Sequence, residues 1–208
     1  MNDTATARRR PGRDLLTFDR TDRWGLLGLL AVLSLAAAWA WVVGPLVAWA
    51  QGDAIPVEMT SPVSVPALEA VGITPGSGTY QVLVEDPTVG QRLLSLAPGV
   101  AWVIIVGLTC WLVWRLMRTI AAGDPFDPAN VTRLRGIGGL LVLGTAVAFA
   151  VELVARGVLT SSIDTGDPVV GVFLSVPWLP MVTGMVAALL AEAFKAGSRL
   201  RDDLDGLV

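Results

Sequence analysis

The sequence predicts an all-α membrane protein of four transmembrane helices, with a small extracytoplasmic β-rich loop between helices 1 and 2. Three observations predict this class. The 208 residues are 53% hydrophobic and only 16% charged, whereas a soluble domain carries about 25% charged residues. Eight Trp residues accompany one Tyr and five Phe, and Trp collects at membrane interfaces. Four apolar segments are long enough to cross a hydrocarbon core about 30 Å thick, which requires roughly 20 helical residues.

A basic arm, residues 1–23, precedes the first predicted helix, residues 24–50. The apolar run is too long for the hydrophobic core of a signal peptide and lacks a clear small-residue cleavage site, so we expect an uncleaved signal anchor. The other three predicted transmembrane helices cover residues 96–117, 136–154 and 170–194. Pro45 lies in the first helix, and Pro177 and Pro180 lie in the fourth. Such breaks are tolerated where neighbouring helices satisfy the freed carbonyl groups.

Basic residues lie mainly on one side of the four predicted helices. They occupy the arm, the loop 118–135 with its flanks, and the tail 195–208, whereas the loops 51–95 and 155–169 carry mainly acidic residues. Because Lys and Arg in short loops favour the cytoplasmic side, both termini are predicted to be cytoplasmic. The sequence therefore predicts a multi-pass protein of the bacterial inner (plasma) membrane, with the two acidic loops outside.

The first extracytoplasmic loop, residues 51–95, is too long to serve only as a connector. Alternating residues at 55–60, 63–65 and 79–85 predict strands, and residues 74–78 form a strong turn signal. We expect a small antiparallel sheet over the outer mouth of the helices. A structural cap is the favoured interpretation, and a surface that senses a ligand or the cell envelope is the alternative.

Small residues recur at helical spacing in three predicted helices. They are Ala36, Ala40, Gly44 and Ala48 in the first, Gly136, Gly144 and Ala148 in the third, and Gly184 and Ala188 in the fourth. Such stripes let helix backbones approach closely in a membrane. Packing within one chain is the favoured interpretation, and a homodimer is the alternative.

Glu152 is the one acidic residue well inside a predicted helix, and Arg156 follows four positions later on the same face. Intramembrane carboxylates are candidate functional groups, so this pair is a candidate polar site. Because the pair lies near the outer boundary, a local ion pair is the favoured interpretation. Glu192, with Lys195 and Arg199 within reach on the same helix, is interpreted as a residue of the inner boundary.

Composition argues against several kinds of chemistry. The chain has no His and a single cysteine, Cys110, so a His-liganded metalloprotease site and thiol-pair chemistry are excluded. Neither a Gly-x-Ser-x-Gly elbow nor a phosphate-binding Gly-rich loop is present. We therefore expect no enzymatic activity, no catalytic or metal-binding residue and no cofactor. An ion pathway normally shows several embedded polar groups, which disfavours transport as well.

The loop 118–135 carries a helix-start signal. Asp127 suits the N-cap and Pro128 the first helical position. An apolar stripe at helical spacing leads from there into the third helix: Val131, Leu134 and Ile137. A cation held by Asp124 and Asp127 is the less favoured interpretation of the two acids.

The tail 195–208 reads as an amphipathic helix. Leu200, Leu204 and Leu207 share one helical face, and acids occupy the other. This pattern favours docking on a partner or on the inner face of the chain's own helices.

Two motifs, one in the loop and one in the tail, resemble a known family. The first begins with Gly-Asp-Pro-Phe at Gly123 and continues through Asn130 to Arg-Leu-Arg-Gly-Ile-Gly at Arg133; the second runs from Leu-Ala-Glu-Ala-Phe at Leu190 to Val208. Together they resemble the bacterial membrane family catalogued as domain of unknown function 2975, which has no established activity. The resemblance implies four membrane spans and, as a candidate cytoplasmic partner, the small helix-turn-helix regulator that often sits beside family members.

The sequence favours a non-enzymatic regulatory or accessory subunit that engages a cytoplasmic partner. The candidate partner-binding residues are Phe126, Asn130, Arg133, Arg135, Leu200 and Leu204. One alternative is a transporter or channel subunit, with Glu152 and the fourth helix lining a path; another is a structural subunit of a larger membrane complex. Expected partners are the lipid bilayer and the regulator or another membrane subunit, with a second copy as the alternative. Direct binding of nucleic acid is not expected.

Overall fold

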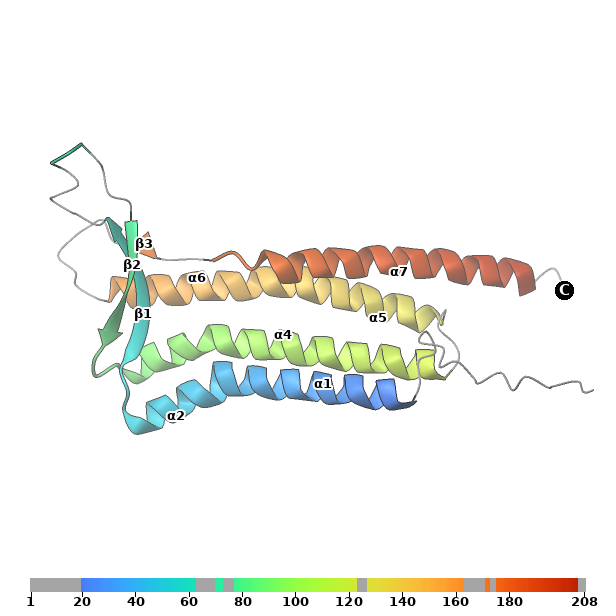
Figure 1. Ribbon diagram of the computed structural model, residues 1–208, viewed down its shortest axis with the longest axis horizontal. Coiled ribbons are helices and arrows are strands. Elements are labelled where there is room, and N and C mark those ends of the chain that lie inside the picture. Colours follow the sequence, from blue (N-terminus) through green and yellow to red (C-terminus); the bar gives the residue numbers. More distant parts are fainter. Residues whose placement is uncertain are drawn as a thin grey trace, which may run out of the picture.

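A computed structural model describes residues 20–62, 70–72, 77–122, 127–162, 171–172 and 175–205. The long helices run side by side as an elongated bundle, and a small sheet lies at one end (Figure 1). We call the end that carries the strands the sheet end, and the opposite end, which holds Arg20 and Asp205, the tail end. The arm up to residue 19, the strand predicted at 63–65 and most of the predicted turn lie outside the described residues.

Four helical segments are long and apolar enough to cross a membrane. They are Trp24–Gln51, Val89–Ala121, Pro128–Ser161 and Trp178–Arg199. Many of their outward side chains are large, apolar and exposed, Trp39 and Leu189 among them, as expected of a surface that lipid covers. The chain therefore has the helices of a multi-pass membrane protein. The first helix begins at the tail end, and the last helix ends there (Figure 1).

The first segment is one helical rod with a widened turn. It consists of α1 (Arg20–Ala38), the π-helical turn η1 (Trp39–Val43) and α2 (Gly44–Gln51). Pro45 lacks an N–H, and its ring crowds the carbonyl four residues earlier, so a wider turn just before it lets the helix continue. The rod ends at Gly52, whose φ of 81° is the left-handed conformation that glycine adopts at helix ends.

The second segment is α4 (Val89–Ala121), which begins earlier than the predicted start at residue 96. Thr88 and Gln91 form a capping box: the Thr88 N–H donates to Gln91 Oε1 at 2.8 Å, and the Gln91 N–H donates to Thr88 Oγ1 at 3.3 Å. The first turns of α4 are amphipathic and include Arg92, so hydropathy alone underestimates the length of this helix.

The third segment joins α5 (Pro128–Gly139), the π-helical turn η2 (Leu140–Gly144) and α6 (Thr145–Ser161). The predicted start signal is confirmed, since Asp127 caps α5 by accepting a hydrogen bond from the Ala129 N–H at 2.8 Å, and Pro128 opens the helix. The helix is longer at both ends than the predicted 136–154, because its first turns belong to the capped loop and carry arginines.

The fourth segment, α7 (Trp178–Asp205), corrects the sequence analysis. The predicted helix began at residue 170, but Gly171–Val172 form a strand, β3, and residues 175–177 are irregular. Pro177 disfavours helical geometry in the residue before it. Pro180 falls in the first turn of α7, where an N–H would have no helical partner in any case. The two prolines therefore delimit this helix and do not break it.

The predicted sheet is confirmed, and it has a third strand that sequence analysis missed. Strand β1 (Ile55–Pro62) pairs antiparallel with β2 (Ser77–Val84) on one side and with β3 on the other. Met59 lies opposite Tyr80 in one pairing and opposite Val172 in the other. β1 buries its alternate apolar side chains, Ile55, Val57 and Met59, in one cluster with Leu159 of α6. The sheet is therefore built onto the end of α6.

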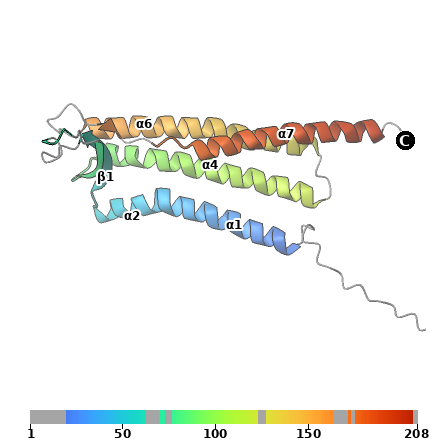
Figure 2. The same cartoon turned by 45° about the horizontal axis from the view of Figure 1, so that its top comes forward.

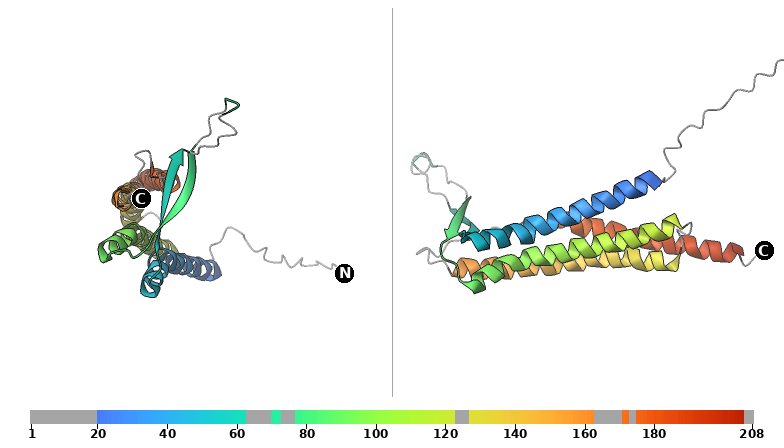
Figure 3. Two further views of the ribbon diagram at one scale, coloured as in Figure 1. Left: turned by 90° about the vertical axis from the view of Figure 1, so that its left-hand side faces the viewer. Right: turned by 90° about the horizontal axis from the view of Figure 1, so that it is seen from below.

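The helices α4, α5, α6 and α7 form the packed part of the bundle, and the first segment lies at one side of it (Figures 2 and 3). That first segment lies against α4, where Trp41 meets Trp102 with ring centroids 6.0 Å apart. Gly99 allows this approach, because an added Cβ would lie 2.2 Å from the Trp41 carbonyl oxygen. The Gly99 contact is thus packing within the chain, whereas Ala36 and Ala40 of the predicted first stripe are exposed.

Candidate functional site

The start of α5 is tied to the end of α4 by a polar node of three residues: Asn130, Arg133 and Thr119. Arg133 Nη1 donates to Asn130 Oδ1 at 2.7 Å and also donates to Thr119 Oγ1. Asn130 is fully buried, at 0% exposure. A buried amide is costly without hydrogen bonds, so this node holds the loop connection between α4 and α5 in one arrangement.

Apolar side chains support the node from inside the bundle. Val131 and Leu134 of α5 are buried with Ala191 of α7, and Leu116 and Phe194 pack against them. The apolar stripe that the sequence predicts in this segment is therefore confirmed, and it faces α4 and α7. Asn130 lies beside it on α5, so the candidate residue is a buried structural polar group and not a surface contact.

Arg135 is paired with α7. Its Nη2 lies 2.5 Å from Glu192 Oε1, and Lys195 Nζ lies 4.0 Å from Glu192 Oε2. Both members of the shorter pair are about half exposed, and exposed pairs contribute little to stability. The sequence placed Glu192 among basic residues of its own helix, but its nearest partner comes from α5. Arg135 therefore links α5 to α7 as well as being a candidate contact for a partner.

The remaining candidate residues of this end divide into two groups. Phe126 lies outside the described residues. Leu200 and Leu204 lie within α7, which stays helical to Asp205. The C-terminal part of α7 extends past the ends of α4 and α5, and none of the described elements runs beside it (Figures 1 and 3). The tail predicted to be an amphipathic helix is thus the projecting end of the fourth long helix.

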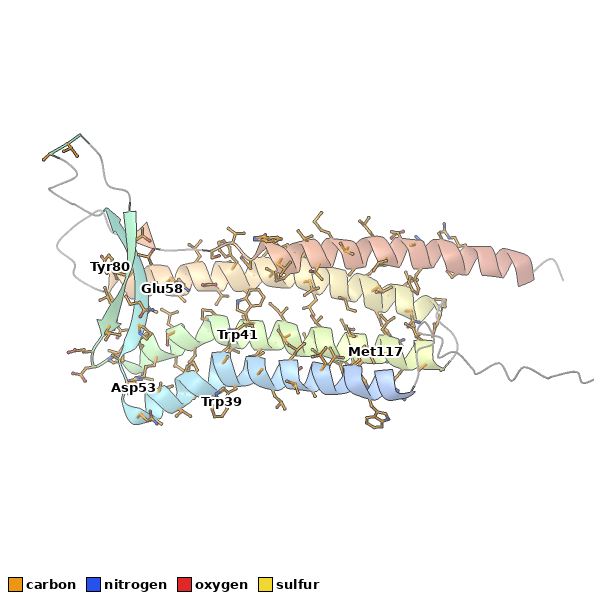
Figure 4. All side chains as sticks on the ribbon, in the orientation of Figure 1. Trp39, Trp41, Asp53, Glu58, Tyr80 and Met117 are labelled. Atoms are coloured by element: carbon orange, nitrogen blue, oxygen red, sulfur yellow. The ribbon has the colours of Figure 1, made fainter. Side chains whose placement is uncertain are left out.

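A second polar cluster lies at the sheet end, where Figure 4 marks Glu58. Arg156 Nη2 lies 2.9 Å from Glu152 Oε1, and Arg156 Nη1 lies 3.3 Å from Glu58 Oε2. The predicted ion pair within α6 is present, and it extends to β1. A cavity of about 280 Å³ lies beside these three side chains, between β1, α4 and α6. The cluster therefore connects the sheet to the helical bundle.

Sequence analysis missed two features of these two ends. Glu58 is 98 residues from Arg156 along the chain, and no local pattern signals that pair. Arg115 and Arg118 served only to orient the helices, yet with Arg133 they line one pocket at the tail end. A pocket between two helices cannot be found from the spacing within either one.

Among the residues that the structure describes, no group of three or more His, Cys, Asp or Glu is placed to hold a metal ion.

The chain is similar to one known protein family. A family model described as "Protein of unknown function (DUF2975)" matches residues 84–208, which is more than half of the chain. The chain belongs to the DUF2975 family. No curated protein and no solved structure matches it. In this DUF2975 protein the polar node, the arginine pocket and α7 all lie inside the matched region, whereas α1, β1 and Glu58 precede it.

Proposed function

We propose that this DUF2975 protein is a non-enzymatic regulatory or accessory membrane subunit whose tail end binds a cytoplasmic protein. The observation that carries the proposal is the projection of α7 beyond the bundle (Figure 1). This stretch of helix extends past the described elements, and apolar positions on a projecting helix suit it to pack on another protein.

The residue pattern of the projecting helix supports a protein partner. Leu200 and Leu204 are one helical turn apart and share a face. The remaining positions of the same turns are polar: one is basic and three are acidic, namely Arg201, Asp202, Asp203 and Asp205. This is the pattern of a helix that lays an apolar face into a groove of a partner. The acids also make nucleic acid an unsuitable ligand for this helix, since its phosphates are negatively charged.

The base of the projecting helix is firmly held. Ala191 and Phe194 pack into the apolar cluster with α5, and Glu192 pairs with Arg135. Binding at the end of α7 therefore acts on a helix that is anchored to α5, and α5 in turn is tied to α4 through Arg133. A helix-turn-helix regulator is the partner that we propose, because it is the partner that the family resemblance implies.

Co-purification from mild detergent tests the proposal. We expect the tagged full-length chain to retain a protein partner that the double variant Leu200→Ala, Leu204→Ala loses. The matched control is Asp202→Ala, which changes the opposite face of the same helix and should keep the partner. An identical partner list for the double variant and the full chain contradicts the proposal.

The cluster at the sheet end favours a second candidate, a transporter or channel subunit. Glu152, Arg156 and Glu58 border a cavity of about 280 Å³, so a polar solute would meet charged groups there. Arg156 bridges both carboxylates, which also fits a structural connection, although the three groups keep one net negative charge. If the cluster lines a path, Glu152→Gln alters a measured flux, and an unchanged flux removes this candidate.

A further inference from the structure

The arginine pocket is the feature of the tail end with the most distinctive chemistry. It has a volume of about 320 Å³ and is lined by Arg115, Arg118, Thr119 and Ala122 of α4 and by Arg133 of α5. Its described lining contains three guanidinium groups and no carboxylate. Three like charges around one cavity repel one another, so an anion that enters it is strongly favoured.

The three guanidinium groups are held by neighbours that leave their charge uncompensated. Arg133 donates to two neutral oxygens, Thr119 Oγ1 and Asn130 Oδ1. The Arg115 guanidinium lies over the Trp111 ring at 5.0 Å, and that of Arg118 lies over the Trp114 ring at 5.2 Å. Contact with an aromatic face orients a cation without neutralising it.

Arg135 provides the contrast. It lies two residues from Arg133 on α5, but its charge is compensated by Glu192 at 2.5 Å. Across the described ranges, no ion pair involves Arg115, Arg118 or Arg133. Among the described residues of the α4–α5 corner, the arginines without an ion pair are therefore those of the pocket, and Arg135 is not one of them.

One face of α4 leads from the middle of this helix to the pocket. Ile104, Leu108, Trp111, Arg115 and Arg118 follow one another at alternating spacings of four and three residues, which places them on a single helix face. The three apolar members are between 44% and 54% exposed. The face thus changes from apolar to aromatic to basic toward the tail end of α4, the end near which Figure 4 labels Met117.

This order of side chains matches the order of groups in a phospholipid. Acyl chains fit the exposed Ile104 and Leu108, the interfacial region fits Trp111, and a phosphate fits the arginines, whose planar guanidinium groups bind phosphate oxygens in pairs. We propose that the Arg115–Arg118–Arg133 pocket binds the headgroup of an anionic phospholipid from the leaflet at the tail end. A free phosphate shares the headgroup chemistry but would make no use of the apolar face.

The test measures lipid affinity of the full-length protein in nonionic detergent by native mass spectrometry. The two probes are phosphatidylglycerol and phosphatidylcholine with the same acyl chains. We expect the protein to prefer phosphatidylglycerol, and we expect Arg115→Gln, Arg118→Gln to weaken its binding by about 25-fold, at roughly fivefold for each arginine near a membrane surface. Equal affinity for the two lipids, or an unchanged affinity in the double variant, overturns the proposal.

A test variant and its matched control separate the pocket from general attraction to a basic surface. Arg118→Gln and Arg135→Gln remove the same charge at the same end of the molecule, and only Arg118→Gln should weaken phosphatidylglycerol binding. Equal effects of the two variants contradict a specific pocket. Both side chains are exposed, so the variants should fold, and an unchanged unfolding temperature checks this.

A final arm of the experiment distinguishes the two sources of phosphate. Glycerol 3-phosphate carries a phosphate and the glycerol backbone but no acyl chain. We expect it to compete with phosphatidylglycerol only at concentrations at least a hundred times those of the lipid, because the apolar face adds most of the lipid's contact area. Competition at equal concentrations would show that the pocket recognises a soluble phosphate, and this would overturn the assignment to a lipid.

Discussion

At the scale of single residues, close backbone contact holds α5 against α7. An added Cβ at Gly184 would lie 2.9 Å from the Gly138 carbonyl oxygen, and one at Gly138 would lie 2.9 Å from the Gly184 carbonyl oxygen. Small residues at both positions let the two backbones meet, and this drives helix association where lipid surrounds the protein.

Gly184→Ala tests this contact. The new methyl group would also lie 2.9 Å from Leu141 Cβ and Val142 Cγ2, so we expect the free energy of unfolding to fall by about 1–3 kcal/mol. Gly157→Ala is the control, since a Cβ there meets nothing within 4 Å, and alanine in a helix is favoured over glycine by up to about 1 kcal/mol. Unfolding in detergent with dodecyl sulfate, followed by circular dichroism, measures both. Equal stability of the two variants would contradict the close contact.

Asn130 tests the polar node. Asn130→Ala removes a fully buried acceptor of the Arg133 guanidinium, and we expect it to lower the free energy of unfolding by about 1–3 kcal/mol. Thr132→Ala, at an exposed position of the same helix, should change it by less than about 0.5 kcal/mol. The same dodecyl sulfate titration compares the two, and a loss no larger than that of the control would show that the node contributes nothing.

At the scale of elements, the sheet is a separate layer fastened to α6. The apolar face of β1 is buried against Leu159, and Arg156 reaches Glu58. A three-stranded sheet of this size is marginal alone, so its stability depends on these contacts with the helix.

Met59→Ala tests this dependence. Met59 is at 0% exposure in the middle of β1, and its truncation should cost about 2–5 kcal/mol, most of it in the sheet. We expect amide hydrogen exchange to become faster in β1 and β2 and to stay unchanged in α4 to α7. Leu83→Ala, at an exposed site on β2, is the control. Equal acceleration throughout the helices would show that the sheet and the bundle unfold together.

The sequence predicted the elements whose causes are local. The four apolar segments follow from hydropathy, and the start of α5 follows from Asp127 and Pro128, which act within two residues of each other. It did not predict features that depend on distant segments. β3 is a strand of two residues that exists because β1 is beside it, and the glycine that meets Gly184 is Gly138, whereas the predicted stripe contained Gly136. Helix periodicity identifies a face, but the neighbouring helix decides which residue of that face makes the contact.

The candidate sites follow the same division. The Glu152–Arg156 pair is one helical turn within α6 and was predicted, whereas Glu58 reaches it from β1. Arg133 was a candidate from its motif, but the pocket that it forms with Arg115 and Arg118 depends on how α4 packs against α5. Residues of both helices are needed to identify that pocket, and one sequence does not indicate which of them meet.

At the scale of the whole molecule, the two ends differ in chemistry. The sheet end has a small β-layer and an ion cluster in which Arg156 bridges two carboxylates. The tail end has the projecting α7, the polar node and three arginines that form no ion pair with the part of the chain that the structure describes. Both proposals concern the tail end and require it to face the cytoplasm for a cytoplasmic partner, or the adjoining leaflet for a lipid. The orientation of the bundle in the membrane is therefore the central claim.

Site-directed cysteine labelling in intact cells tests this orientation directly. In a Cys110→Ala background, Asp53→Cys adds an exposed thiol at the sheet end and Ala121→Cys adds one at the tail end. We expect a membrane-impermeant maleimide, added after the outer membrane is permeabilised where the host has one, to label the Asp53→Cys protein. It should label the Ala121→Cys protein only after the inner membrane is disrupted. Labelling of the Ala121→Cys protein while the inner membrane is intact, with protection at position 53, would contradict the predicted orientation.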